Sequence, residues 1–73
     1  MKGFQFPRTY ADLDAAPWCF GYESAGDGCF IYIKDAWLPD DWDEASPWGE
    51  TLKEALSDLH FFWRHMRPPS VNA

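Results

Sequence analysis

Between Trp18 and Lys34, aromatic and β-branched residues alternate with smaller or polar residues on both sides of Ala25-Gly26-Asp27-Gly28. Such alternation is typical of strands that turn one face to a core, and the central segment has the composition of a tight turn. The pattern therefore predicts a β-hairpin over residues 18–34.

A two-residue turn at Gly26-Asp27, with a positive φ at the glycine, sets the expected register of this hairpin. Tyr22 then faces Ile31, and Phe20 faces Ile33, on the side of the core. The other side of the hairpin is half polar and partly open to water: it carries Cys19, Gly21, Glu23, Phe30, Tyr32 and Lys34. A turn shifted by one residue would change these pairs.

Farther along the chain, apolar residues recur at three- and four-residue spacing up to Met66, which is the period of an amphipathic helix. Thr51 followed by Glu54 has the composition of a helix N-cap, and the proline pair after Arg67 cannot continue a helix. The pattern predicts one long helix at about residues 51–66, with an apolar stripe that covers the hairpin.

Two shorter elements are expected before the hairpin. Phe4 and Phe6 have the spacing of a short edge strand. Thr9 and Asp12 resemble a capping box for a short helix that Pro17 would end.

Together these elements predict an α+β fold. The hairpin forms a small antiparallel sheet that packs on one C-terminal helix. A third strand from the N-terminus can extend this sheet. Residues 1–67 are expected to form a single compact domain, and residues 68–73 a disordered tail. A domain of this size buries only about 60% of its unfolded surface, so we expect no large enzyme-like cavity.

The segment from Asp35 to Glu50 combines acids with tryptophans and contains no basic residue. A solvated loop keeps carboxylates in water and offers them to a basic partner, while tryptophans are frequent anchors in interfaces. The candidate partner-binding residues here are Trp37, Asp40, Asp41, Trp42, Asp43, Glu44 and Trp48. A second interpretation has equal weight: the tryptophans fold back as a lid on a small core, and both can hold for different tryptophans.

The N-terminal segment is a further candidate interface. Phe4, Phe6 and Arg8 belong to it, and the phenylalanines would be hard to bury fully in so small a domain. Deletion of this segment is therefore a test to run beside changes in the acidic loop.

The charge of the chain narrows the class of partner. Twelve acidic and six basic residues give a formal net charge of −6. This opposes binding to bare nucleic acid, because neutralisation of phosphates supplies most of that affinity. A basic protein surface is the expected partner. No apolar run approaches the roughly 20 residues that span a bilayer, so we expect no membrane association and a cytoplasmic monomer.

Residues that could carry chemistry are few and scattered. Cys19 and Cys29 point to opposite faces of the expected hairpin, which indicates reduced, packed thiols. His60 and His65 lie five residues apart on one helix and diverge. Neither a calcium-loop pattern nor a nucleophile with a positioned base is recognisable. The sequence predicts no metal, no cofactor and no enzymatic activity.

The run from Asp27 to Ile33, followed by Gly49 to Leu59, resembles the HicB antitoxin pattern, a local likeness at residues 27–59. In that family a strand after an Asp-Gly turn leads to a further strand, a glycine, an acid, a threonine and a helix that begins Glu-Ala-Leu. The resemblance implies a small sheet packed on one helix, and an antitoxin that masks a small basic toxin. An insertion rich in tryptophan and acid before Gly49 departs from the pattern, as does the lack of a recognisable DNA-binding segment.

In size, acidity and freedom from catalytic motifs the chain also resembles small bacteriophage proteins that regulate host RNA polymerase, of the type found in a Xanthomonas phage. That resemblance implies contact with polymerase subunits and inhibition of transcription in the host cytoplasm. Our first functional hypothesis is therefore a non-catalytic acidic regulator that docks on a basic surface of host RNA polymerase. The alternatives are a HicB-like antitoxin and a DNA mimic that inhibits a restriction or CRISPR nuclease.

Overall fold

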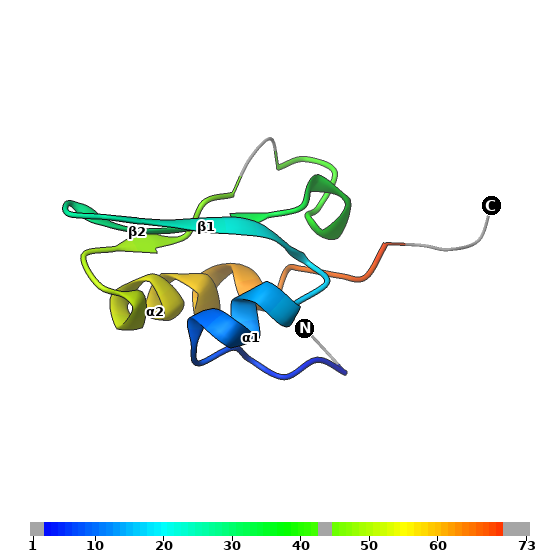
Figure 1. Cartoon of the computed structure of the whole chain (residues 1–73). Coiled ribbons are helices and arrows are strands. Elements are labelled where there is room, and N and C mark those ends of the chain that lie inside the picture. The colour runs from blue at the N-terminus through cyan, green and yellow to red at the C-terminus, as the bar shows by residue number, and fades with distance from the viewer. Residues whose placement is uncertain (1–2, 43–44, 70–73) are drawn as a thin grey trace.

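The computed structural model describes residues 3–42 and 45–69 of the chain. Figure 1 shows a sheet with helices on one of its sides, which confirms the predicted α+β fold. In chain order the elements are helix α1 (Tyr10–Ala15), strands β1 (Cys19–Ala25) and β2 (Gly28–Ile33), the 3-10 turn η1 (Asp35–Trp37), strand β3 (Trp48–Gly49) and helix α2 (Leu52–Trp63).

The sheet is antiparallel, with the strand order β1-β2-β3. Ala25 pairs with Gly28, so the two-residue turn at Gly26-Asp27 is confirmed, as is the predicted pair of Tyr22 with Ile31. The expected positive φ at Gly26 is wrong, since Gly3 is the one residue with a positive φ in the described part of the chain.

A β-bulge at the start of β1 changes the rest of the predicted register. Cys19 pairs with Ile33, and Gly21 pairs with the preceding Tyr32, so Phe20 has no partner across the ladder. An extra residue in one strand shifts the side chains beyond it to the opposite face. The prediction that Phe20 faces Ile33 in the core is therefore wrong, because Phe20 is 78% exposed.

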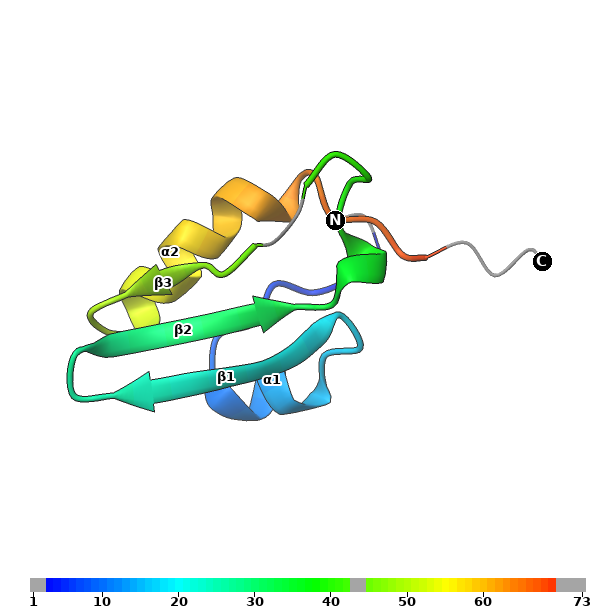
Figure 2. The ribbon, with the colours of Figure 1, turned by 90° about the horizontal axis from the view of Figure 1, so that it is seen from above.

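The third strand comes from a different part of the chain than predicted. Trp48–Gly49 pairs with Phe30 and Cys29 on the free edge of β2, as Figure 2 shows from above. The N-terminal segment forms no strand, because Pro7 has no N–H to give to a ladder and the ring of Phe6 stacks on the helix side of the protein.

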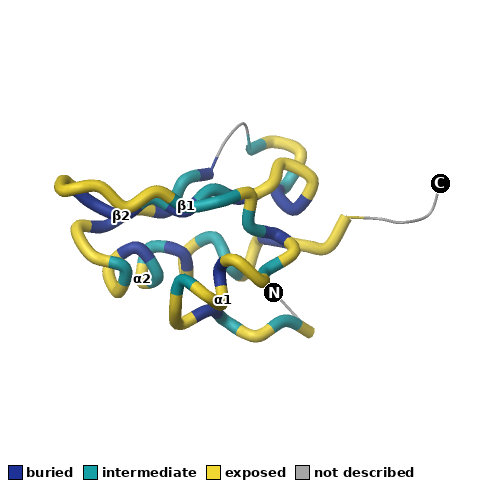
Figure 3. Tube along the Cα trace, viewed as in Figure 1, coloured by how far each residue is buried: buried dark blue, intermediate teal, exposed yellow. Residues whose placement is uncertain are grey.

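Both helices lie on the same side of the sheet, and the core fills the space between (Figures 1 and 3). The predicted capping box of α1 is present: the Thr9 hydroxyl accepts the Asp12 N–H, and the Asp12 carboxylate accepts the Thr9 N–H. The buried hydrophobic residues are Leu13, Trp18, Cys29, Ile31, Ile33, Trp37, Leu38, Ala45, Ala55, Leu59 and Met66.

The C-terminal helix begins as predicted and ends early. The Thr51 hydroxyl accepts the Glu54 N–H at 3.2 Å, which caps α2 at its first turn. The helix ends at Trp63 instead of residue 66, and the N–H of His65 bonds to the carbonyl of Phe62, three residues back, which tightens the last turn. The predicted tail falls partly outside the described residues, at 70–73.

Candidate functional site: the open face of the sheet

The two faces of strand β2 have different environments. Cys29, Ile31 and Ile33 point toward the helices and are 1%, 0% and 6% exposed. Phe30 and Tyr32 alternate with them and so point to the other side, which neither helix covers. This open side of the sheet therefore presents aromatic side chains to solvent, where alternation with polar residues would be the usual pattern.

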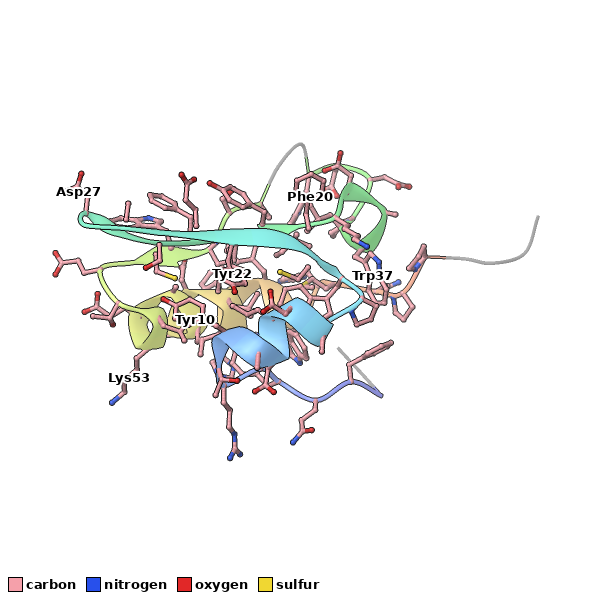
Figure 4. All side chains as sticks on the ribbon, in the orientation of Figure 1. Tyr10, Phe20, Tyr22, Asp27, Trp37 and Lys53 are labelled. Atoms are coloured by element: carbon pink, nitrogen blue, oxygen red, sulfur yellow. The ribbon has the colours of Figure 1, made fainter. Side chains whose placement is uncertain are left out.

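Four aromatic residues from three strands share this open side, and we call them the aromatic face: Phe20, Phe30, Tyr32 and Trp48. The rings of Phe30 and Trp48 stack across the β2–β3 pair with centroids 6.1 Å apart and planes 20° apart. Figure 4 shows Phe20 on the opposite side of the sheet from Tyr22. Trp48 is 54% exposed, so its ring remains accessible beside that of Phe30.

Polar groups lie at one end of the aromatic face. The Tyr32 hydroxyl donates a hydrogen bond to the Glu23 carboxylate at 2.9 Å, which holds that carboxylate over the sheet. Phe20 and Tyr32 also line a shallow hollow of about 510 Å³ together with Lys34 and Asp35. A partner that binds at this end contacts aromatic rings bordered by both acidic and basic side chains.

A second hollow lies on the other side of Trp48, between β3 and the start of α2. We call it the acidic groove; it is lined by Trp48, Gly49, Glu50, Glu54, Ser57 and Asp58 and has a volume of about 560 Å³. The Asp58 carboxylate accepts the Trp48 N–H at 3.1 Å, and the Glu54 carboxylate accepts the Glu50 N–H at 2.9 Å. One bond ties the Asp58 carboxylate to β3, and the other ties the Glu54 carboxylate to the residue that follows β3.

Trp37, one of the predicted anchors, lies in the core. It is 8% exposed, its ring meets Phe4 edge-on at a centroid distance of 5.4 Å, and its carbonyl accepts the Arg67 N–H at 3.0 Å. For this residue the lid interpretation is confirmed. Packing in the core is enough to explain a tryptophan at this position, and no binding partner needs to be invoked.

Trp42 has an intermediate position. It is half-buried, with its ring against Phe62 at 5.6 Å and His65 at 5.1 Å between centroids. Asp40 and Asp41 are exposed beside it.

The charge of the acidic loop is partly balanced by the chain itself. Asp40 and Asp41 line the same hollow as Arg64 and Arg67 from the segment that follows α2. The predicted residues Asp43 and Glu44 lie outside the described part of the chain. Of the predicted loop candidates, Trp48 lies on an exposed surface that also contains carboxylates. Those carboxylates belong to Glu50, just before α2, and to Glu54 and Asp58 in α2.

The N-terminal candidates lie on the helix side of the protein. The ring of Phe6 stacks on His60 at a centroid distance of 3.8 Å with the planes 8° apart, and it meets Trp63 edge-on at 4.9 Å. Phe4 is half-buried against Trp37, and Arg8 is exposed. Neither phenylalanine reaches the aromatic face.

The cysteines are free thiols with different access to solvent. Cys29 is buried, and Cys19 is half-buried and donates to the Gly21 carbonyl at 3.2 Å. Burial raises the pKa of the Cys19 thiol, which lowers its nucleophilicity at neutral pH. Within residues 3–42 and 45–69, no three histidine, cysteine or acidic side chains gather as a set of metal ligands.

Comparison with protein-family models, with curated proteins and with solved structures found no match to this chain. The resemblances to HicB antitoxins and to phage regulators therefore stay predictions. Among the described helices, none combines the length and the apolar character that crossing a bilayer requires.

Sequence reasoning missed part of this site. It placed Phe30, Tyr32 and Glu23 on a partly wet face, which the register confirms. It also placed Cys19 on that face, which is wrong, because the bulge pairs Cys19 with Ile33 and Cys19 packs against the core. It missed Phe20, because no residue in the segment signals the bulge, and it treated Glu54 and Asp58 as parts of a helix only. The available signal was their spacing: residues four apart on a helix share one face, and Glu50 leads into it.

Proposed function

We propose that this chain is a non-catalytic interaction protein that binds a basic surface of a protein partner through the aromatic face, with the acidic groove aligning that partner. The observation that carries this proposal is the exposure of Phe20 and Trp48, at 78% and 54%, on the uncovered side of the sheet. Apolar patches with polar borders are frequent sites of protein interaction.

The arrangement of the four rings supports a continuous contact surface. Phe30 and Trp48 stack on one another, while Phe20 and Tyr32 line one hollow. Aromatic residues dominate the binding energy of interfaces because each buries a large area at a low cost in side-chain entropy. Burial in the core does not account for Phe20 and Trp48, since both are exposed and neither α1 nor α2 lies on this side of the sheet.

The charge beside the rings supports a basic partner. Glu50, Glu54 and Asp58 line the groove next to Trp48, and the whole chain has a formal net charge of −6. Complementary charge raises the rate of encounter and fixes the orientation of two proteins. The same charge disfavours binding to bare nucleic acid.

A bacterial host RNA polymerase is the first partner that we propose, with inhibition of transcription as the outcome. This choice rests on the resemblance in size and acidity to small phage regulators, and the aromatic face supplies a surface with which such a protein would bind. Polymerase binding is tested with the purified enzyme, by biolayer interferometry on immobilised chain and by a promoter-dependent transcription assay.

The decisive variant replaces Phe20 and Trp48 together with alanine. We expect its affinity for polymerase to fall by at least about tenfold, because exposed rings at the centre of an interface commonly contribute this much. Phe61→Ala is the matched control: Phe61 is 75% exposed but belongs to α2, on the other side of the sheet. Circular dichroism of all variants confirms that they fold.

Two results would overturn parts of this proposal separately. Unchanged affinity of the double variant, with polymerase bound by the parent chain, shows that the aromatic face is not the interface. Failure of the parent chain to bind polymerase core or holoenzyme shows that the proposed target is wrong. A change from Glu to Gln at positions 50 and 54 should reduce the salt dependence of binding, and an unaltered dependence removes the groove from the interface.

A further inference from the structure

A second hollow with a different charge lies on the helix side of the protein. Residues 5–8 run along α2 there and leave a groove of about 590 Å³. We call it the basic groove; its lining residues are Gln5, Phe6, Pro7, Arg8, Leu52, Lys53, Leu56 and His60. Figure 4 shows Lys53 extending away from the sheet, so this groove and the aromatic face are on opposite sides of the molecule.

We infer that the basic groove is a docking site for a segment of a partner protein that carries carboxylates beside apolar side chains. Its floor is apolar, with Leu52, Leu56 and the ring of Phe6, and its border carries Arg8 and Lys53. No carboxylate belongs to its lining, although the chain has twelve acidic residues and six basic ones. Charge complementarity therefore selects an acidic occupant.

The position of Lys53 is not explained by the stability of α2. Lys53 lies in the first turn of the helix, directly after Thr51 and Leu52. The positive end of the helix dipole is at this terminus, so a cation there is unfavourable and an anion is favourable. A ligand carboxylate at Lys53 would interact favourably with both the ammonium group and the dipole.

The groove is organised before any ligand binds. Lys53, Leu56 and His60 follow one another at three- and four-residue spacing and share one face of α2. The imidazole of His60 is held flat against Phe6, with the ring planes 8° apart.

The opposite wall is also held in place. The Asp12 carboxylate accepts the Arg8 N–H at 2.9 Å, which fixes the backbone at Arg8 while its side chain stays exposed. The backbone of this wall therefore loses little conformational entropy on binding.

The test uses the full chain and a short fluorescein-labelled peptide in which glutamate alternates with leucine and phenylalanine. A peptide with glutamine at every glutamate position is the matched control. We expect saturable binding of the acidic peptide by fluorescence anisotropy, weakened by salt, and at least about fivefold weaker binding of the glutamine peptide.

Substitutions locate the site. Arg8→Glu with Lys53→Glu should weaken binding of the acidic peptide by about tenfold or more, since two attractive pairs become repulsive. Folding should be retained, because both side chains are exposed and a carboxylate in the first turn of α2 suits the helix dipole, although the loss of the Arg8 charge beside Asp12 should lower stability slightly. Lys34→Glu is the control: Lys34 is an exposed cation that lines the hollow beside Phe20 on the other side of the sheet.

Three outcomes would overturn the inference. They are equal binding of the acidic and glutamine peptides, unchanged binding by the Arg8→Glu and Lys53→Glu variant, and tighter binding of a polyuridine oligonucleotide than of the acidic peptide. The Phe20→Ala and Trp48→Ala variant should bind the acidic peptide as the parent does. A failure at the basic groove is therefore distinguishable from a failure at the aromatic face.

Discussion

Both faces of the sheet carry large apolar side chains, but the helices bury one face and leave the other open to solvent. On β2, Ile31 is completely buried against the helices, and Phe30 and Tyr32 on either side of it point to the open side. The covered face meets α1, α2 and the buried Trp18, while neither α-helix lies over the open face, which meets Asp35, Ala45 and Ser46 beside Phe20. Burial of apolar surface stabilises a fold only where something covers it. The aromatic residues of the open face therefore have no structural role of comparable weight, and this difference directs the functional proposal to them.

The largest effect on this comparison is expected from a matched pair of alanine variants, one from each face. Ile31→Ala should lower the free energy of unfolding by about 2–5 kcal/mol, because a fully buried side chain leaves a cavity. Phe20→Ala should change it by less than about 0.5 kcal/mol, since Phe20 is 78% exposed. Urea denaturation followed by far-UV circular dichroism measures both values.

This pair can also break the comparison. A loss of stability in Phe20→Ala as large as that in Ile31→Ala would mean that the open face is covered in solution, for example by a second copy of the chain. Sedimentation at several concentrations of the parent chain tests that case, because a dimer would dissociate on dilution.

A smaller loss of stability is expected from substitution of Gly49, the residue of β3 that packs against α2 and follows Trp48 of the aromatic face. A Cβ atom at this position would collide with the backbone of Glu54 and Ala55 in α2, so the strand would have to move away from the helix. Gly49→Ala should therefore cost about 1–3 kcal/mol in unfolding free energy, as overpacking does elsewhere. It should also weaken partner binding, because the neighbouring Trp48 moves with the strand.

Gly26→Ala is the control for that substitution. A Cβ atom at Gly26 meets nothing within 4 Å, and the residue has no positive φ. Its stability should stay the same or rise by about 0.4–1 kcal/mol, since alanine lowers the entropy of the unfolded chain. Equal stability of the Gly49→Ala and Gly26→Ala variants would show that β3 is not held closely against α2.

Much of the fold was predictable because its signals are local. Alternation marked the hairpin, and turn composition set the pairing of Tyr22 with Ile31. The Thr9 and Thr51 caps marked the start of both helices. The third strand was not predictable in this way: a two-residue strand has no period, and its pairing with β2 depends on tertiary contacts of Trp48–Gly49 with α2.

The site was less predictable than the fold. Composition assigned the tryptophans and the carboxylates of the site to one loop, whereas the carboxylates beside the exposed Trp48 come from Glu50 and α2. Whether a tryptophan packs inward depends on the distant residues that it meets, such as Phe4 for Trp37 and Phe62 for Trp42. The aromatic face needed a register with a bulge, and a shift of one residue moves a side chain from one face to the other.

The smallest predicted effect concerns the cap of α1, the helix that closes the covered face beneath β1. The Asp12 carboxylate accepts the N–H groups of Arg8 and Thr9, and the Arg8 bond is the main cause that lowers its pKa below the ordinary value. A lowered pKa in the folded state means that the contribution to stability is fully present above the unfolded pKa and disappears as the pH falls through the folded value.

Asp12→Asn should therefore be slightly less stable than the parent chain at pH 6, and the difference should shrink as the pH falls through the lowered pKa of Asp12 in the folded state, below which the protonated carboxyl resembles the amide. Urea midpoints of the two proteins, measured side by side across this range, test the convergence. Other acidic groups titrate in both proteins and cancel in the difference. A stability difference between the two proteins that stays constant with pH would mean that the side-chain bonds of Asp12, and not its charge, hold α1 in place. Acidification would then leave α1 packed on the covered face.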